Sequence, residues 1–484
     1  MQQLRGVDAL HVLEETRDQH MHTAKVALLA PGPDGVPTFD DVREWAQERL
    51  LRIPALRWMV RPIPLKLAKP VFLDAGPYDV GPHLHAETLP PPGGPVELDE
   101  LVSRIASVQV DRSRPLWELT YVTGLESGSF DGATVALVFK LHHSIMDGQA
   151  SLRFLELVFD GGEQLDFGPP PPAEPEPTKA QLVRFSVVEQ AKLYGQLPQV
   201  LRRTVASIRD NRSRKKSGAP PVVNPLSGPS TRFNRWPVPE RVYVDVTVPM
   251  ADLRALRAAT GRTINELFVT LCGGAIRRYL QAHGEEPDRC LNAAHPVSLR
   301  RPEERDAFGN RTSYWYVSLG TDVADPVERL AVVKASLDAA REWAKGDVEL
   351  FAVWQDYYLL FGRMTLKSLT LAERLTKRPA FNAIVSNVRG PAPLSLNGAP
   401  VVAVRSMGPI TRVLGLNLTA WSYRENFSIG LQACRQFMPD LRSFDEHLRA
   451  ELAAFVAAAV PSEDERVAGV GAGGEDVAEL REQR

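Results

Sequence analysis

The chain has 484 residues, of which 44% are hydrophobic and 24% are charged, and its formal net charge is -2 at pH 7. This length suits two domains of about 150 to 220 residues each, and the composition is typical of a globular protein. A net charge so close to zero argues against a nucleic-acid binder held by bulk electrostatics.

Residues 1–168 alternate strand-like and helix-like patterns. Apolar runs at residues 24–30 and 133–141 predict strands. Apolar residues at helical spacing predict helices over residues 39–51 and 98–108. This mixture predicts an α/β domain.

A proline-rich run begins at Pro169 and ends this domain, because proline fixes φ and has no N–H to donate. Apolar residues between Leu182 and Ile208 then recur at helical spacing, which predicts an amphipathic helix bent at Pro198. Residues 169–235 are therefore predicted to be a proline-rich and helical linker.

Residues 236–460 carry a second α/β pattern. The predicted elements are a strand at 242–248, a helix from about 263 to 283, and strands around 314–319 and 414–421. Residues 461–484 are rich in Gly, Ala and Glu without periodicity, which predicts a disordered tail.

The most specific local signal is the run His-His-Ser-Ile-Met-Asp-Gly at residues 142–148, between the second predicted strand and a helix predicted over 149–159. Side chains on a strand alternate faces, so only one of His142 and His143 enters a given cleft. The strand is apolar on both faces, and burial there keeps a histidine neutral. A neutral imidazole can accept the hydroxyl proton of an alcohol.

Two further residues of this run shape the turn. Asp147 occupies an N-cap position, where its carboxylate accepts backbone N–H groups, and Gly148 permits close backbone approach. The structural alternative for the whole run is a pair of core histidines beside a capped helix.

The pattern HHxxxDG resembles that of the CoA-dependent acyltransferase superfamily, which includes chloramphenicol acetyltransferases and the condensation domains of peptide synthetases. Flanking segments make the chain similar to the bacterial wax ester synthase/diacylglycerol O-acyltransferase family from about residue 4 to 458. These segments are Val-Asp-Ala at 7–9, Met-His at 21–22, Pro-Leu-Trp-Glu at 115–118, Pro-Val-Ser-Leu-Arg at 296–300, Gly-Asn at 309–310 and Ser-Asn-Val at 386–388. The resemblance implies two similar chloramphenicol-acetyltransferase-like domains, each a mixed sheet flanked by helices, joined by a helical linker.

The resemblance also implies an activity: transfer of a long-chain acyl group from acyl-CoA to diacylglycerol, giving triacylglycerol, or to a fatty alcohol, giving a wax ester. His143 is then the general base, and no metal or cofactor is expected, because acyl-CoA is a substrate. The catalytic residues implied are His143, His142, Asp147, Gly148 and Asn265. The substrate-binding residues implied are Ser144, Glu266, Arg300, Asn310 and Asn387.

Two of these assignments have structural alternatives. The pair Asn265-Glu266 stands where the family has Asn-Asp, and Glu266 could instead be a first-turn carboxylate of the predicted helix. Arg300 could bind an internal carboxylate rather than a phosphate of CoA.

Partners and location follow from composition and pattern. Residues 350–378 interleave aromatic and basic side chains, which suits either peripheral contact with a membrane or lipid droplet or a core helix pair with a basic edge. A signal peptide, a membrane span and any CxxC motif are missing, so a cytoplasmic protein at the inner membrane face or on lipid inclusions is expected. Homodimerisation is left open.

Two rival functions remain at this stage. One is acyl transfer to a small or polyketide-like acceptor, and the other is a non-catalytic lipid-binding protein of lipid droplets.

Overall fold

The computed structural model describes residues 1–64, 68–162, 167–218, 222–224, 226–357, 370–373, 375–412 and 414–460. The predicted tail at 461–484 lies outside the described residues. So do residues 358–369, within the aromatic and basic stretch predicted to contact lipid.

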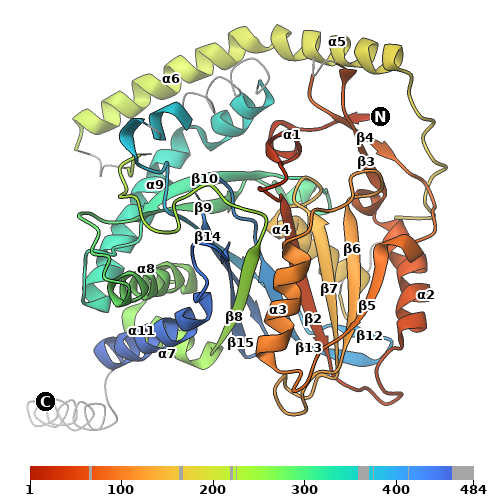
Figure 1. Cartoon of the computed structure of the whole chain (residues 1–484). Coiled ribbons are helices and arrows are strands. Elements are labelled where there is room, and N and C mark those ends of the chain that lie inside the picture. Colours follow the sequence, from red (N-terminus) through yellow and green to blue (C-terminus); the bar gives the residue numbers. More distant parts are fainter. Residues whose placement is uncertain are drawn as a thin grey trace, which may run out of the picture.

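Two mixed six-stranded sheets form the body of the molecule (Figure 1). The first has the order β12-β13-β2-β7-β6-β5, with only the β5–β6 pair parallel. Its strands are β2 (His22–Leu29), β5 (Leu84–Thr88), β6 (Trp117–Thr123), β7 (Val135–His142), β12 (Ser395–Leu396) and β13 (Ala399–Met407).

The second sheet has the order β10-β9-β11-β14-β15-β8, and β11 is parallel to both of its neighbours. Its strands are β8 (Arg241–Pro249), β9 (Asn292–Ser298), β10 (Thr312–Ser318), β11 (Ala383–Arg389), β14 (Leu416–Tyr423) and β15 (Asn426–Cys434). A small third sheet contains β1 (Gln2–Gln3), β3 (Trp58–Arg61) and β4 (Val71–Asp74).

Helices cover the sheets according to the alternation of side chains along the strands. On β7, Leu137 and Phe139 pack with α2 (Phe39–Arg49) and α4 (Gly148–Val158), whereas Ala136 and Val138 pack with α3 (Pro95–Ala106). One face of the second sheet packs against α7 (Met250–Thr260), α8 (Ile264–Ala282), α9 (Pro326–Asp356) and α11 (Phe444–Ala459). The other face of the second sheet is turned toward the first half of the chain.

The two halves share a strand. β13 lies in the second half of the sequence but pairs with β2 in the first sheet, where Arg405 is opposite Val26 and Met407 is opposite Ala24. The chain then returns to the second sheet as β14. This exchange ties the two halves together and fixes how the sheets face each other.

The linker region forms two helices, α5 (Lys179–Gly195) and α6 (Leu197–Lys216), which cross one end of the molecule as an arch (Figure 1). They separate at Gln196, two residues before the predicted bend at Pro198. α6 contacts α9, with Val200 buried against Tyr357.

The predicted fold class is confirmed: the chain is α/β, with two mixed sheets flanked by helices. The strands predicted at 24–30, 133–141 and 242–248 are β2, β7 and β8, and the helix predicted at about 263–283 is α8.

Candidate active site

A cavity of about 170 Å³ lies between the two sheets, and both halves of the chain line it. The wall from the first half includes His11 of α1 (Gly6–Glu14), Met21, Thr23 and Lys25 of β2 and its approach, His143, and Asp147 and Gly148 at the start of α4. The wall from the second half includes Pro296, Ser298, Asn310, Thr312, Tyr314, Ser386, Asn387, Asn417, Thr419 and Trp421. His143, Asp147 and Gly148 of the histidine motif therefore line a cavity that both halves of the chain enclose.

His143 is fixed at the rim of β7 by its backbone and by the packing of its ring. Its N–H donates to the carbonyl of Met21 at 2.7 Å, and its carbonyl accepts from Asn310 Nδ2 at 2.7 Å. The imidazole lines the cavity and packs on His11, with 4.5 Å between the ring centroids. The His143 backbone is thus held by Met21, just before β2, and by Asn310, in the loop before β10, and the ring packs on α1.

Burial lowers the pKa of His143 to about 4, because the enclosed site disfavours the charged imidazolium. Burial also holds the pKa of His11 well below its ordinary value. At neutral pH both rings are uncharged, so the imidazole of His143 has a free lone pair for a proton.

His142 points to the opposite face of the sheet and is fully buried. Its Nδ1 lies 2.7 Å from Ser144 Oγ and its Nε2 lies 3.5 Å from Glu15 Oε2. Burial alone would raise the pKa of Glu15, but His142, the Met21 N–H and Arg112 together outweigh it, and the pKa of Glu15 is lowered. His142 and Ser144 therefore form a buried polar cluster beneath the motif, away from the described cavity wall.

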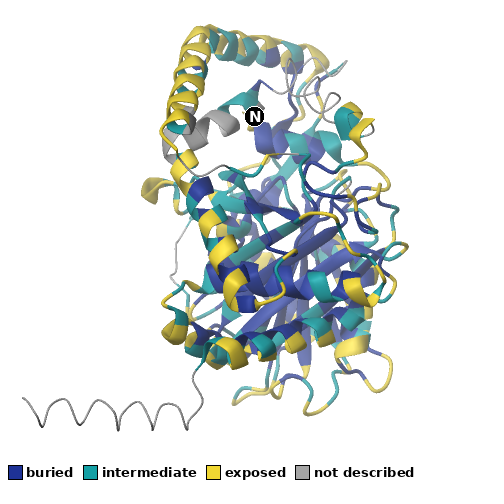
Figure 2. Cartoon of the chain, turned by 90° about the vertical axis from the view of Figure 1, so that its left-hand side faces the viewer, coloured by how far each residue is buried: buried dark blue, intermediate teal, exposed yellow. Residues whose placement is uncertain are grey.

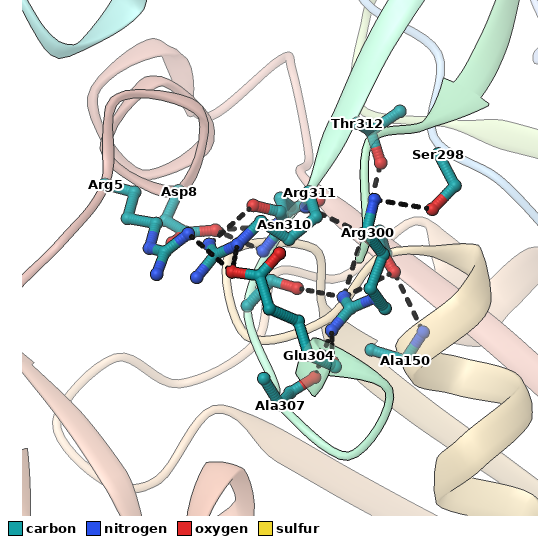
Figure 3. Close-up of polar contacts among 12 residues, drawn as sticks. Arg5, Asp8, Ala150, Ser298, Arg300, Glu304, Ala307, Asn310, Arg311 and Thr312 are labelled. Carbon is teal, nitrogen blue, oxygen red and sulfur yellow. Dashed lines mark hydrogen bonds and ion pairs between the residues drawn. The ribbon is translucent and has the colours of Figure 1, made fainter. Parts of the chain in front are cut away.

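A carboxyl on α1 supports the loop that holds His143. Asp8 accepts from the backbone N–H of Asn310 at 2.9 Å and from its Nδ2 at 2.7 Å, as Figure 3 shows. Burial raises the pKa of Asp8 to about 7. Since the same Nδ2 donates to the His143 carbonyl, Asn310 links α1 to the turn that carries His143.

Asp147 joins the histidine motif to the second half of the chain. Its carboxylate caps α4 by accepting from Ala150 N at 2.8 Å, and it also accepts from Arg311 N at 2.8 Å and from Arg300 Nη2 at 3.1 Å. The ion pair is almost fully enclosed, with 6% of Arg300 and 3% of Asp147 exposed. Arg300 thus binds an internal carboxylate, the structural alternative considered for it.

Gly148 is required by the approach of the second sheet. A Cβ built at this position would lie 2.9 Å from Val388 Cγ2 on β11, too close for any larger residue without a shift. The motif's aspartate therefore binds the second half of the chain, and its glycine leaves room for β11 beside the cavity.

The predicted residues on α8 lie behind the cavity wall. Glu266 forms a capping box with Thr263, accepting the Thr263 N–H at 2.8 Å while its own N–H donates to Thr263 Oγ1 at 3.2 Å. Asn265 Nδ2 is 3.2 Å from His295 Nε2, and its Oδ1 is 3.5 Å from Asn387 Nδ2. Asn387, on β11, lines the cavity. Asn265 and Glu266 are not among the described residues that line it.

The sequence patterns did not single out His11, Lys25, Tyr314 or Trp421 as site residues, although all four line the cavity. A usable signal was present for Lys25, a charged residue inside the otherwise apolar run at 24–30. The other three are ordinary core residue types, and only the packing of the two sheets brings them to the site.

Comparison with known proteins identifies relatives over nearly the whole chain. A model of the wax ester synthase/diacylglycerol acyltransferase catalytic domain matches residues 4–268, and a model of the C-terminal domain of the same proteins matches residues 308–455. A Mycobacterium tuberculosis protein whose name assigns it to the diacylglycerol O-acyltransferases is 32% identical over 440 residues, covering 89% of this chain and 91% of that protein.

Two solved structures extend the comparison. The wax ester synthase/diacylglycerol acyltransferase from Marinobacter aquaeolei VT8 is 25% identical, with a TM-score of 0.64, covering 94% of this chain and 99% of that one. The starter condensation domain of rhizomide synthetase, solved with C8-CoA and Leu-SNAC, is 13% identical with a TM-score of 0.55, covering 95% of each chain. At 13% identity, the similarity to this condensation domain shows that the two chains share a fold.

The Asp147–Arg300 ion pair generates a prediction about stability. Asp147→Asn keeps an acceptor for the α4 cap but leaves the enclosed guanidinium of Arg300 without its counter-charge. We expect the free energy of unfolding to fall by about 3 kcal/mol, measured by chemical denaturation.

The matched control is Asp445→Asn in the first turn of α11, where Asp445 pairs with Arg449 and both side chains are at least 39% exposed. That change should cost under about 1 kcal/mol. Equal losses in the two variants would contradict the role given to the enclosed pair.

Proposed function

The chain belongs to the wax ester synthase/diacylglycerol acyltransferase family, and we propose that it transfers a long-chain acyl group from acyl-CoA to the hydroxyl of diacylglycerol or of a fatty alcohol. The relatives' names support diacylglycerol as an acceptor, and the Marinobacter structure supports both products. One observation carries the mechanism: His143 presents a neutral imidazole to a cavity that both halves of the chain enclose.

The proposed reaction needs one base and no covalent acyl-enzyme. A ring nitrogen of His143 takes the hydroxyl proton while the alcohol oxygen attacks the thioester carbonyl. The new C–O bond forms, the C–S bond breaks, and the imidazolium returns the proton to the departing CoA thiolate. A lowered pKa makes the imidazolium a ready proton donor for that last step.

Substitution of the base tests this proposal. Release of free thiol from palmitoyl-CoA, with diolein or hexadecanol as acceptor, should fall about 10²- to 10⁴-fold in His143→Ala. His283→Ala is a matched control, because His283, at the C-terminal end of α8, pairs with Asp440 and is not among the described residues lining the cavity. We expect that variant to keep activity within about twofold.

The outcomes separate the rival functions. Equal thiol release by the parent and His143→Ala would remove the general-base role. Release with small hydroxyl acceptors, but with neither lipid acceptor, would point to the small-acceptor alternative. Lipid binding by the parent without any thiol release would point to a non-catalytic lipid-binding protein.

Access to lipid acceptors requires contact with a lipid surface, and we propose that α6 provides it. In the described part of the chain, no helix is long and apolar enough to cross a membrane. α6 instead exposes Leu201, Val205 and Ile208 along one stripe, with 47%, 59% and 47% of each side chain exposed. Figure 2 shows the arch of α5 and α6 as largely exposed.

Basic residues flank this stripe. A surface groove of about 440 Å³ is lined by Val205 and Ile208 together with Arg209, Arg212 and Lys216. An apolar stripe beside cations is the pattern of helices that lie in the interface of anionic lipid. From sequence, residues 350–378 suited either this role or a core helix pair with a basic edge, and part of that stretch lies outside the described residues.

Vesicle flotation tests the proposed surface. Replacing Leu201, Val205 and Ile208 together by Ser should weaken binding to vesicles of phosphatidylglycerol and phosphatidylcholine at least about tenfold, because their apolar area no longer enters the interface. Val187→Ser with Val188→Ser on α5 removes exposed apolar area away from the groove and should weaken it less. Unchanged binding by the α6 variant would contradict the assignment.

A further inference from the structure

Among the described residues lining the cavity, Lys25 is the only lysine. It lies on β2 and is 3% exposed. Its Nζ donates to Ser406 Oγ at 2.6 Å and to Thr23 Oγ1 at 3.2 Å, and it sits 4.9 Å from the centroid of the Trp421 ring. The ammonium is therefore held in one place, by two hydroxyls and an aromatic face.

No carboxylate in the described part of the chain forms an ion pair with Lys25. A matched lysine on the neighbouring strand shows the contrast: Lys140 of β7 is equally buried, but its Nζ lies 3.1 Å from Glu118 Oε2. Burying an ammonium costs free energy that an anion offsets far better than hydroxyls do. The surroundings of Lys25 thus favour negative charge inside the cavity.

Lys25 reaches toward His143 along β2. Met21, Thr23 and Lys25 alternate onto the cavity face, and Met21 is the residue whose carbonyl binds the His143 N–H. Residues two apart on a strand are roughly 7 Å apart. Because Lys25 Nζ is hydrogen-bonded to Thr23, it lies roughly that distance from Met21. The charge of Lys25 also contributes to lowering the pKa of His143, after the larger effect of burial.

The other titratable groups around the cavity leave Lys25 without a competing partner. From α1, β10 and the start of α4 these are His11, Tyr314 and Asp147, and the Asp147 carboxylate is already occupied by Arg300. Burial raises the pKa of Tyr314 to about 12, so it stays neutral.

The neighbouring strands of the same sheet also carry charged residues. Arg405 of β13 pairs with Asp245 at 3.3 Å, on the side of the sheet that α3 covers, and Lys140 pairs with Glu118 on that same side.

Burial lowers the pKa of Lys25 to about 7.

We propose that Lys25 is a further catalytic residue, whose ammonium stabilises the negative charge that develops on the thioester carbonyl oxygen during the acyl transfer proposed above. The alcohol oxygen, its proton passing to His143, bonds to the carbonyl carbon, and the C=O electron pair moves onto oxygen. Lys25 donates an N–H to that oxygen, which becomes a carbonyl again as the CoA thiolate leaves.

The geometry favours the reacting oxygen over other roles. An alcohol oxygen that donates its proton to the His143 ring lies about 2.8 Å from it, and the thioester carbonyl oxygen lies one or two bonds beyond the alcohol oxygen. A second hydrogen bond of about 2.8 Å then joins that carbonyl oxygen to Lys25 Nζ. A donor in an enclosed, water-poor site is worth most where charge develops. Asn265, which the family resemblance implied as a catalytic residue, has its Nδ2 engaged with His295.

The pH dependence of kcat/KM for thiol release tests this role, since that quantity reports the free enzyme. The proposed reaction needs His143 neutral and Lys25 charged. The parent kcat/KM should therefore follow a bell-shaped pH profile, with an acid limb near pH 4 and an alkaline limb near pH 7. Lys25→Met, similar in length and apolar, should lose about 10²- to 10³-fold in kcat, with a smaller change in KM, and lose the alkaline limb. Lys25→Arg should restore part of kcat and move that limb to higher pH.

Lys140→Met is the matched control, because it removes a buried lysine from the adjacent strand but on the opposite face. It should keep the alkaline limb. Lys25→Met with parental kcat and an intact alkaline limb would overturn the proposal while leaving the acyltransferase function in place. A parent protein that releases no thiol would overturn both.

Discussion

Enclosure of the end of β7 is the constraint on which the site depends. Apart from Lys140, which pairs with Glu118, the strand is apolar on both faces up to His142, and all of its residues are buried. Because that environment disfavours charge, the imidazole of His143 is kept neutral, as its proposed role as a base requires. The same low-dielectric surroundings would strengthen the effect of Lys25 on a developing anion, so one physical cause supports both halves of the proposed chemistry.

An enclosed site between two sheets needs those sheets to be held in register. β13 crosses from the second half into the first sheet, and the carboxylate of Asp147 binds Arg300 and the backbone of Arg311 from the other half. Gly148 lets β11 approach the start of α4. Asp147 and Gly148 of the motif thus lie where the two halves meet, whereas His142 contacts Ser144 and Glu15 on the other face of the sheet.

Much of this could be predicted from sequence, where the signal is local. The periodicity of β2, β7, β8 and α8 gave each element to within a few residues, and alternation along β7 gave the opposite orientations of the two histidines. For Glu266, both a substrate contact and a helix cap were compatible with the pattern, and the structure places it in the capping box with Thr263.

Features that depend on distant parts of the chain could not be predicted in this way. The pairing of β13 with β2 joins residues more than 370 positions apart, for which one strand's pattern contains no information. The partners of Asp8, His11 and Lys25 are likewise set by how the sheets meet. Arg300 had two possible anions, a phosphate or a carboxylate, and only the fold decides that Asp147 is the one it binds.

The most direct test of the account is an NMR titration of the His143 ring in protein carrying isotope-labelled histidine, with His143→Ala used to assign its signal. The account predicts a pKa near 4, far below the ordinary value of 6.5, and a ring that is neutral at physiological pH. A titration midpoint at or above 6.5 would contradict it, because the imidazole would then be solvated or paired with an anion rather than enclosed as a neutral base.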